Sequence, residues 1–203
     1  MKKALIVVDV QNDFCPGGSL AVPEGDKIIP VINDLLPKFD LVIFTKDWHD
    51  PEMEAFASQH GKKPFEKYIN SDGQEDILWP DHCVRNTFGA DLHEGIDFGK
   101  CRGDFYIFKK GLGKKYHPYS GFGGTDLAEF LRNRKITDIF VTGLALDYCV
   151  KDTALDASKE GFITCVIEDG CAPINPDINL TLKAFHDEGI SFIESWELEE
   201  YLK

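Results

Sequence analysis

The sequence predicts a three-layer α/β fold, in which a doubly wound, mostly parallel sheet carries helices on both faces. Short apolar runs rich in β-branched residues alternate with segments of helical spacing along most of the chain. The apolar runs are nearly continuous, as is typical of strands buried on both faces of a parallel sheet. The chain of 203 residues can bury one sizeable core, so we expect a single domain over residues 1–203.

Each element of this fold has its own pattern. Continuous apolar runs predict strands, and apolar residues three and four positions apart predict the helices between them. Pro30 and Pro37 limit where the first helix can begin and end. The predicted strands are ALIVV (4–8), LVIFT (41–45), FYIF (105–108), ITDIFVT (136–142), ITCVI (163–167) and ISFI (190–193). The predicted helices are residues 26–39, 125–134, 149–160, 177–188 and 196–202.

Residues 48–104 interrupt this alternation. The segment is rich in proline, glycine, histidine and charged residues. A structureless loop of that length is uncommon in a compact domain. We therefore expect an inserted metal-binding or cap segment that forms short helices and packs over the sheet edge.

Composition excludes several classes of partner. The net charge of −13 argues against binding to nucleic acid or to an anionic membrane. The apolar run that follows the first three residues is too short for a signal peptide or a membrane span. The six cysteines have no CxxC spacing, so we expect reduced thiols in a cytoplasmic protein.

Reactive residue types follow several of the predicted strands. Asp9 follows the first strand, Lys109 and Lys110 follow the third, and Cys149 comes after the fourth. Ligands of open α/β sheets bind beyond the carboxyl ends of the strands, where these residues would supply a base, a cation and a nucleophile. Strand alternation sends the two lysines to opposite sides, and the spacing does not choose between them.

Cys149 is expected to open the helix 149–160, with Asp147 as the N-cap. The free N–H groups and the dipole of a helix start favour a thiolate. The dipole contributes roughly 0.3–1 kcal/mol, less than the roughly 1.4 kcal/mol that corresponds to one pKa unit. A nucleophilic Cys149 therefore needs a base and a cation from elsewhere. The alternative is a buried structural thiol.

A second group of residues has metal-ligand character. Asp47 and His49 are two positions apart, so an extended segment projects both to one side, and His82 would be the third ligand. Two nitrogens and one oxygen suit Zn²⁺, with Fe²⁺ or Mn²⁺ as alternatives. Cys83 is a competing ligand that would point away from an extended segment. A surface Asp–His pair and a turn histidine behind a proline are the alternative interpretations.

Taken together, these segments resemble the isochorismatase-like cysteine hydrolases, and within them the nicotinamidases. The resemblance extends over nearly the whole chain, and the DxH and WPxHC pair favours the nicotinamidase branch. The lysine segment departs from the family by being longer and more basic. The matching segments, in chain order, are IVVDVQNDFCPGGSL, TKDWHDP, WPDHC, KKGLGKKYHPYSGF and GLALDYCVKDTALDA.

The resemblance assigns roles to the strand-end residues. Asp9 would be the general base and Cys149 would be the nucleophile. The catalytic cation would be Lys110, because it is the lysine directly before a glycine. The peptide between Leu144 and Ala145 would be cis, and the backbone N–H groups of Ala145 and Cys149 would bind the oxyanion.

The resemblance also implies a substrate and a metal. The reaction would convert nicotinamide, and also pyrazinamide, to the acid and ammonia through a thioester, as part of NAD salvage. The metal on Asp47, His49 and His82 would hold the pyridine nitrogen. The ring would pack on Phe14, Trp79 and Tyr148.

Three other functions remain open at this point, together with assembly into a homo-oligomer. One is another cysteine hydrolase of the same superfamily, acting on a ureido, carbamoyl or isochorismate-like substrate. A second is a catalytically silent relative that binds a ligand or partner, although every catalytic residue type is present. A third is a structural zinc protein, which three ligands with open positions argue against.

Overall fold

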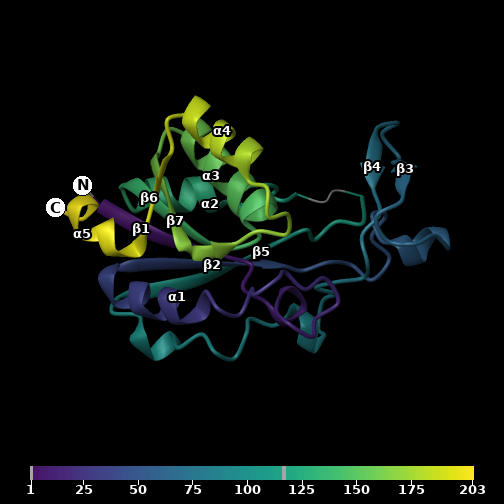
Figure 1. The fold of residues 1–203 in the computed structure, drawn as a ribbon, viewed down its shortest axis with the longest axis horizontal. Helices are drawn as coiled ribbons and strands as arrows, with labels where there is room; N and C mark the ends of the chain where they lie inside the picture. The colour runs from purple at the N-terminus through teal and green to yellow at the C-terminus, as the bar shows by residue number, and fades with distance from the viewer. Residues whose placement is uncertain (1, 116–117) are drawn as a thin grey trace.

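A six-stranded parallel sheet forms the centre of the molecule (Figure 1). The computed structural model describes residues 2–115 and 118–203, and the strand order is β5-β2-β1-β6-β7-β8. This architecture confirms the predicted doubly wound sheet. The strands are β1 (Lys2–Val8), β2 (Leu41–Asp47), β5 (Asp104–Lys110), β6 (Ile136–Leu144), β7 (Ile163–Ala172) and β8 (Ser191–Ile193).

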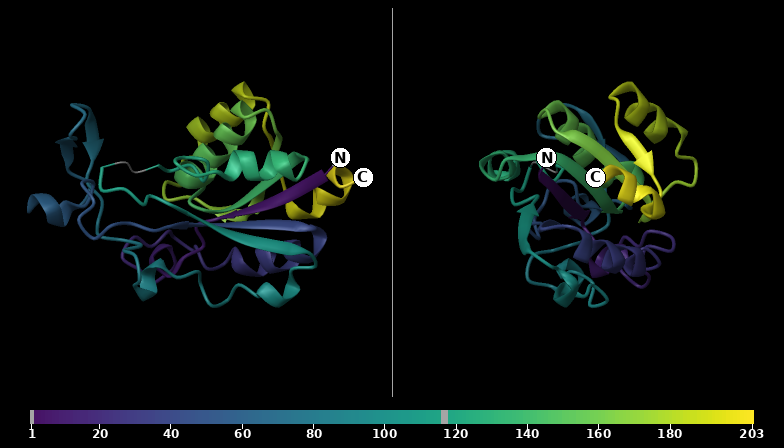
Figure 2. Two further views of the ribbon diagram at one scale, coloured as in Figure 1. Left: turned by 180° about the vertical axis from the view of Figure 1, so that it is seen from behind. Right: turned by 90° about the vertical axis from the view of Figure 1, so that its left-hand side faces the viewer.

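Helices cover both faces of this sheet (Figures 1 and 2). Side chains alternate between the faces of a strand, so β1 feeds two cores: Leu5 and Val7 pack on one face, and Ile6 and Val8 on the other. Burial on both faces explains why the strands read as continuous apolar runs. The first face is covered by α1 (Ile29–Leu35) and α5 (Leu198–Tyr201), the second by α2 (Leu127–Asn133), α3 (Lys151–Lys159) and α4 (Asn179–Asp187).

The first helix is shorter than the sequence pattern predicts. The α-helix α1 begins at Ile29 and is followed at once by a 3₁₀ turn over Leu36–Lys38. Pro30 and Pro37 each lie in the first turn of their element. A proline fits there because its missing N–H is not needed in a first turn, whereas inside a helix it breaks the hydrogen-bond ladder.

Residues 48–104, where the sequence predicts short helices, form short 3₁₀ helices and one hairpin. The hairpin strands β3 (Lys67–Ile69) and β4 (Glu75–Ile77) are antiparallel and project away from the layers (Figure 2). Further along, Phe98 packs edge-on against Phe44 of β2, with ring centroids 5.0 Å apart. The segment therefore starts at the carboxyl end of the sheet and returns along the face that carries α1.

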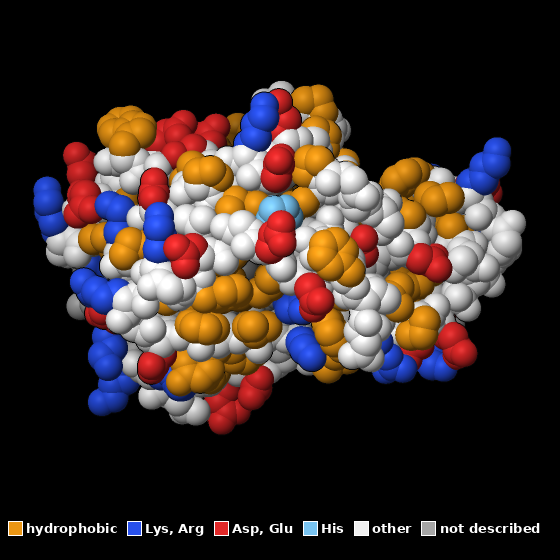
Figure 3. Space-filling model, turned by 90° about the horizontal axis from the view of Figure 1, so that it is seen from below, with side chains coloured by type: hydrophobic (Ala, Val, Ile, Leu, Met, Phe, Trp, Pro, Cys, Tyr) orange, Lys and Arg blue, Asp and Glu red, His pale blue; other side chains and the backbone are white. Residues whose placement is uncertain are grey.

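The surface on the side of α1 mixes apolar side chains with charges of both signs (Figure 3). Lysine and arginine side chains gather toward the end of this face where the chain termini lie. None of the helices in the described part of the chain is long and apolar enough to cross a membrane. All six cysteines are described and are free thiols.

Candidate active site

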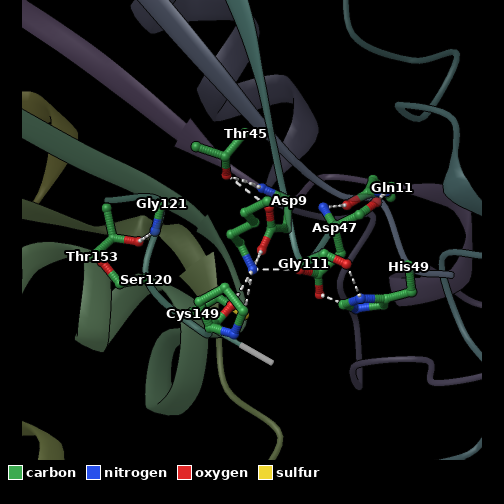
Figure 4. Close-up of polar contacts among 12 residues, drawn as sticks. Asp9, Gln11, Thr45, Asp47, His49, Gly111, Ser120, Gly121, Cys149 and Thr153 are labelled. Atoms are coloured by element: carbon green, nitrogen blue, oxygen red, sulfur yellow. Dashed lines mark hydrogen bonds and ion pairs between the residues drawn. The ribbon is translucent and has the colours of Figure 1, made fainter. Parts of the chain in front are cut away.

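The carboxyl end of β1 delivers Asp9 into a fully buried position. Its φ angle of +48° turns the chain out of the strand directly after Val8. Its backbone N–H donates to Thr45 Oγ1 at 3.2 Å, and the Thr45 hydroxyl donates to Asp9 Oδ1 at 2.7 Å (Figure 4). A buried carboxylate needs such partners, and its second oxygen, Oδ2, is left to face Lys110.

The last residue of β5, Lys110, connects the reactive groups. Its Nζ lies 2.9 Å from Asp9 Oδ2 and 2.5 Å from Asp47 Oδ1, and it approaches Cys149 Sγ at 3.6 Å. The same ammonium donates to the Pro118 carbonyl at 3.3 Å. A carboxylate, an ammonium and a thiol from three strand ends therefore meet in one buried cluster, as the sequence predicts.

The register of β5 against β2 determines which lysine faces the site. Lys110 pairs with Asp47, and Lys109 pairs with Lys46. Alternation sends the second pair to the other side of the sheet. There, the ammonium groups of Lys109 and Lys46 lie 3.8 and 4.5 Å from the centroid of the Trp48 ring. Trp48 thus gives Lys109 a partner away from the site.

The local structure around Cys149 corrects two predictions. A π-helical turn over Leu146–Val150 precedes α3, so Cys149 lies within a wide turn and does not open the α-helix. The N-cap position of this turn is Ala145. Asp147 does not cap it, because its carboxylate accepts the backbone N–H groups of Ile174 and Asn175, each at 2.9 Å. This wide turn directs the buried thiol of Cys149 toward the end of β5.

The peptide bond between Leu144 and Ala145 is cis, which is the geometry that the family resemblance implies. The carbonyl of Ala145 accepts the N–H groups of Tyr148 and Val150, each at 3.1 Å. These bonds tie the end of β6 to the turn that carries Cys149.

The electrostatics of the cluster keep the thiol of Cys149 protonated and make the carboxylate of Asp9 more basic than usual. Burial raises the pKa of Asp9, and the ammonium of Lys110 only partly opposes this shift. Burial would lower the pKa of Lys110, but Asp47 and Asp9 raise it well above its ordinary value. Burial also raises the pKa of Cys149, because its effect is larger than the opposite effect of the Lys110 ammonium, which lowers the pKa. Cys149 is therefore a neutral thiol beside a carboxylate that is more basic than usual.

Next to this cluster, Asp47, His49 and His82 form a buried group with the geometry of metal ligands. Asp47 Oδ2 lies 3.3 Å from His49 Nε2 and 3.9 Å from His82 Nε2. The Nδ1 atoms lie 3.2 Å from the Gly111 carbonyl and 2.7 Å from the Pro80 carbonyl. Each Nδ1–H can donate to its carbonyl, which leaves Nε2 of both rings as the ligand atom.

The chemistry of these donors fits a divalent metal. Burial and the neighbouring His49 lower the pKa of His82 to about 4, so its ring is neutral near pH 7, as metal ligation requires. Cys83 lies outside this ligand group and packs in the core. Asp9, Asp47 and Cys149 also lie close together, but the ammonium of Lys110 occupies the centre of that set and repels a cation.

A pocket opens beside both clusters, and the three ring-packing candidates line it. Its wall includes Phe14, Trp79 and Tyr148, next to His82 and Cys149. Trp79 and Tyr148 meet edge to face with ring centroids 5.5 Å apart. The pocket lies between the thiol of Cys149 and the ligand residue His82, and most of its wall is apolar or aromatic.

Sequence reasoning missed several supporting residues of this site. Tyr119, which belongs to the lysine segment, lines the pocket. Its aromatic side chain was the only feature of the sequence that could have indicated this role. Gln11 clamps the end of β2, because its amide exchanges hydrogen bonds of 2.8 Å with both the N–H and the carbonyl of Asp47. Asp13 accepts the N–H of Cys83 at 2.7 Å and so fixes the residue next to His82. Thr45 holds Asp9.

Comparison with known proteins agrees with this geometry. Residues 3–183 match the family model of the isochorismatase domain. The chain is 43% identical to the nicotinamidase of Acinetobacter baylyi over 187 residues, which cover 89% of this chain and 85% of that protein.

Two solved structures are close in fold. A nicotinamidase and pyrazinamidase of Acinetobacter baumanii superposes with a TM-score of 0.90 at 39% identity, covering 97% of this chain and 98% of the other. The pyrazinamidase of Pyrococcus horikoshii, solved in complex with zinc, superposes with a TM-score of 0.81 at 38% identity, covering 96% and 99%.

The chain therefore belongs to the isochorismatase family. Its family match and its relatives identify it as a hydrolase of that family. Within the family, it is similar to the nicotinamidases over most of its length. The buried ligand group and the zinc-bound relative together support a divalent metal at Asp47, His49 and His82.

Proposed function

We propose that this protein is a metal-dependent amidohydrolase that converts nicotinamide to nicotinate and ammonia through a thioester on Cys149. Pyrazinamide would be a second substrate, and the reaction would serve NAD salvage. The observation that carries the proposal is Lys110, whose ammonium lies 2.9 Å from Asp9 Oδ2 and 3.6 Å from Cys149 Sγ. Base, cation and nucleophile meet beside a pocket walled by aromatic side chains.

The first half of the reaction needs one proton to move twice. A carboxylate oxygen of Asp9 lies within 4.8 Å of Cys149 Sγ, so Asp9 takes the thiol proton as sulfur attacks the carboxamide carbon. The raised pKa of Asp9 suits this step, because a more basic carboxylate is a better proton acceptor. When the C–N bond breaks, Asp9 returns the proton to the leaving nitrogen, and ammonia departs from a thioester.

The second half hydrolyses the thioester. Asp9 accepts a proton from a water molecule, whose oxygen attacks the thioester carbon. When the C–S bond breaks, Asp9 returns this proton to sulfur, and nicotinic acid leaves and ionises to nicotinate. Negative charge on the carbonyl oxygen would be bound by the backbone N–H groups of Ala145 and Cys149. Lys110 stays protonated throughout and stabilises whichever partner, Asp9 or the sulfur, is negative.

The metal would be held by Asp47, His49 and His82. A divalent cation held there would supply a Lewis acid for the pyridine nitrogen and so help to orient the ring, which is a positioning role. We favour Zn²⁺, because the site offers two nitrogens and one oxygen and because a relative was solved with zinc. Phe14, Trp79 and Tyr148 would pack on the ring. The six free cysteines support a reducing, cytoplasmic location.

The proposal is tested by measuring ammonia release from nicotinamide by the zinc-loaded protein, with and without a chelator. We expect release that Cys149→Ala lowers by roughly 10³-fold or more. Cys171→Ala removes another partly buried thiol and should retain the activity. Ammonia release from a ureido substrate, with none from nicotinamide, would overturn the proposed substrate. Full activity of Cys149→Ala would overturn the mechanism.

A further inference from the structure

Thr45 makes two hydrogen bonds that together fix the proposed base. The β1–β2 ladder pairs residues as far as Val7 and Phe44, so the backbone of Asp9 lies just past its end. The Asp9 N–H donates instead to Thr45 Oγ1 at 3.2 Å, and the hydroxyl lies 2.7 Å from Asp9 Oδ1. Both side chains are fully buried, so no water competes for these groups.

The two bonds determine where the hydroxyl hydrogen lies. An N–H group can only donate, so Thr45 Oγ1 is the acceptor in the bond from Asp9 N. Its single hydrogen is then directed to Asp9 Oδ1, which must act as an acceptor. This hydrogen bond commits Oδ1 to Thr45, on the side of β2. The other oxygen, Oδ2, faces Lys110 at 2.9 Å.

We propose that Thr45 is a positioning residue that reserves Oδ2 of Asp9 for the proton taken from Cys149. This inference rests on the proposed function, because it assumes that Asp9 is the base. The proton that leaves sulfur is then bound to the oxygen on the side of the site, from which it reaches the leaving nitrogen. Without Thr45, the proton could also rest on Oδ1, where it is lost to the reaction.

The surroundings of Thr45 leave little room for another arrangement. A side chain at Gly121 would place its Cβ 2.9 Å from the Thr45 methyl group. The N–H of Gly121 donates to Thr153 Oγ1 at 2.9 Å, which ties this glycine to α3. The loop that runs from Pro118, whose carbonyl accepts from Lys110, to Gly121 therefore packs against Thr45. The hydroxyl of Thr45 is thereby held toward Asp9.

Thr45→Val tests the proposal, because valine keeps the shape of threonine and removes the hydroxyl. We expect kcat for nicotinamide to fall by roughly 10–100-fold while KM changes by less than about twofold. Thr45→Ser keeps the hydroxyl and should restore kcat to within about threefold of the unaltered enzyme. Thr142→Val is the matched control, since it removes another fully buried hydroxyl, which donates to the Gly170 carbonyl.

Two further readouts separate the possible failures. Unaltered kcat in Thr45→Val, or equal losses in Thr45→Val and Thr142→Val, would overturn the positioning role. If Thr45→Val does not fold, a kcat of Thr45→Ser as low as that of a Thr45→Ala variant would overturn it instead. Absence of ammonia release by the unaltered enzyme would reject the proposed function alone. The rate of Cys149 alkylation by iodoacetamide, which needs no substrate, would then show whether Thr45→Val slows proton loss from the thiol.

Discussion

Asp47 and Lys110 are register partners on neighbouring parallel strands, and Lys110 Nζ lies 2.5 Å from Asp47 Oδ1. The other oxygen of Asp47 faces the two histidines, with His49 Nε2 at 3.3 Å. One carboxylate therefore belongs to the metal-ligand group and to the catalytic cluster at once. A change of charge at the ligand group therefore acts directly on Lys110.

Lys110→Gln should lower kcat by roughly 10²–10³-fold, because it removes the buried cation that stabilises charge on Asp9 and Cys149. Lys109→Gln is the matched control, since Lys109 stacks on Trp48 outside the site, and it should retain near-normal kcat. Steady-state kinetics of both variants with nicotinamide provide the measurement. A larger loss in Lys109→Gln would mean that the wrong lysine has been assigned.

Gly111→Ala should weaken metal binding by roughly 10–100-fold, the range typical of changes around metal-ligating histidines. Gly111 has φ +70°, and an added Cβ would lie 2.5 Å from the His49 ring, whose Nδ1 is held by the Gly111 carbonyl. Gly113→Ala is the control, because nothing lies within 4 Å of its Cβ position. Elemental analysis after dialysis against a range of zinc concentrations tests this, and equal zinc retention by both variants would contradict it.

Metal removal should slow alkylation of Cys149. Without metal, Asp9, Asp47 and Lys110 carry a net charge of −1, and a thiolate would add to it. A bound divalent cation reverses the sign of this local charge, so we expect alkylation at pH 8 to be about tenfold or more faster in the zinc-loaded protein, which corresponds to a pKa lowered by at least about one unit. Mass spectrometry after iodoacetamide treatment resolves each cysteine. Equal rates with and without zinc would show that the two groups are not coupled.

Stability should fall above about pH 9 because of two thiols that lie outside the catalytic cluster. Burial raises the pKa of Cys165 and of Cys171 to about 12. Unfolded thiols ionise first, so the unfolded state binds fewer protons, and the free energy of unfolding falls by up to about 1.4 kcal/mol per pH unit for each thiol. Urea unfolding between pH 8 and about pH 10.5 measures this slope.

Cys165→Ala should make that slope shallower. Val166→Ala, a core truncation without a thiol, should lower stability equally at every pH. An unchanged slope in Cys165→Ala would assign the loss of stability to other groups.

The sequence predicted the structure best where a local pattern of residues was enough to determine it. Buried strands show as apolar runs, and their carboxyl ends lie on one sheet edge, which brought Asp9 and Cys149 together. The predicted start of the helix after β6 was wrong because Asp147 is of a residue type that commonly forms an N-cap, although it does not cap this helix. Its carboxylate binds N–H groups of Ile174 and Asn175, and no local pattern reveals so distant a partner.

The strand register and the role of the Thr45 hydroxyl could not be predicted from the sequence for the same reason: both depend on partners that are distant in the chain. The choice of Lys110 over Lys109 depends on how β5 aligns with β2 and on the ring of Trp48. Thr45 lies in the run LVIFT and has the appearance of an ordinary β-branched strand residue. Its role becomes visible only once Asp9 turns out of β1 and needs a partner for its N–H.

The position of β5 at the sheet edge also affects how the enzyme would fail on heating. Within the described residues, β2 is the only strand that pairs with β5, and Lys110 is its last residue. Edge elements open locally at lower free energy than the centre of a sheet. Fraying of this one strand would withdraw the ammonium while the remaining strands stay paired. Heat inactivation should therefore precede global unfolding, with the amide protons of β5 exchanging before those of β1.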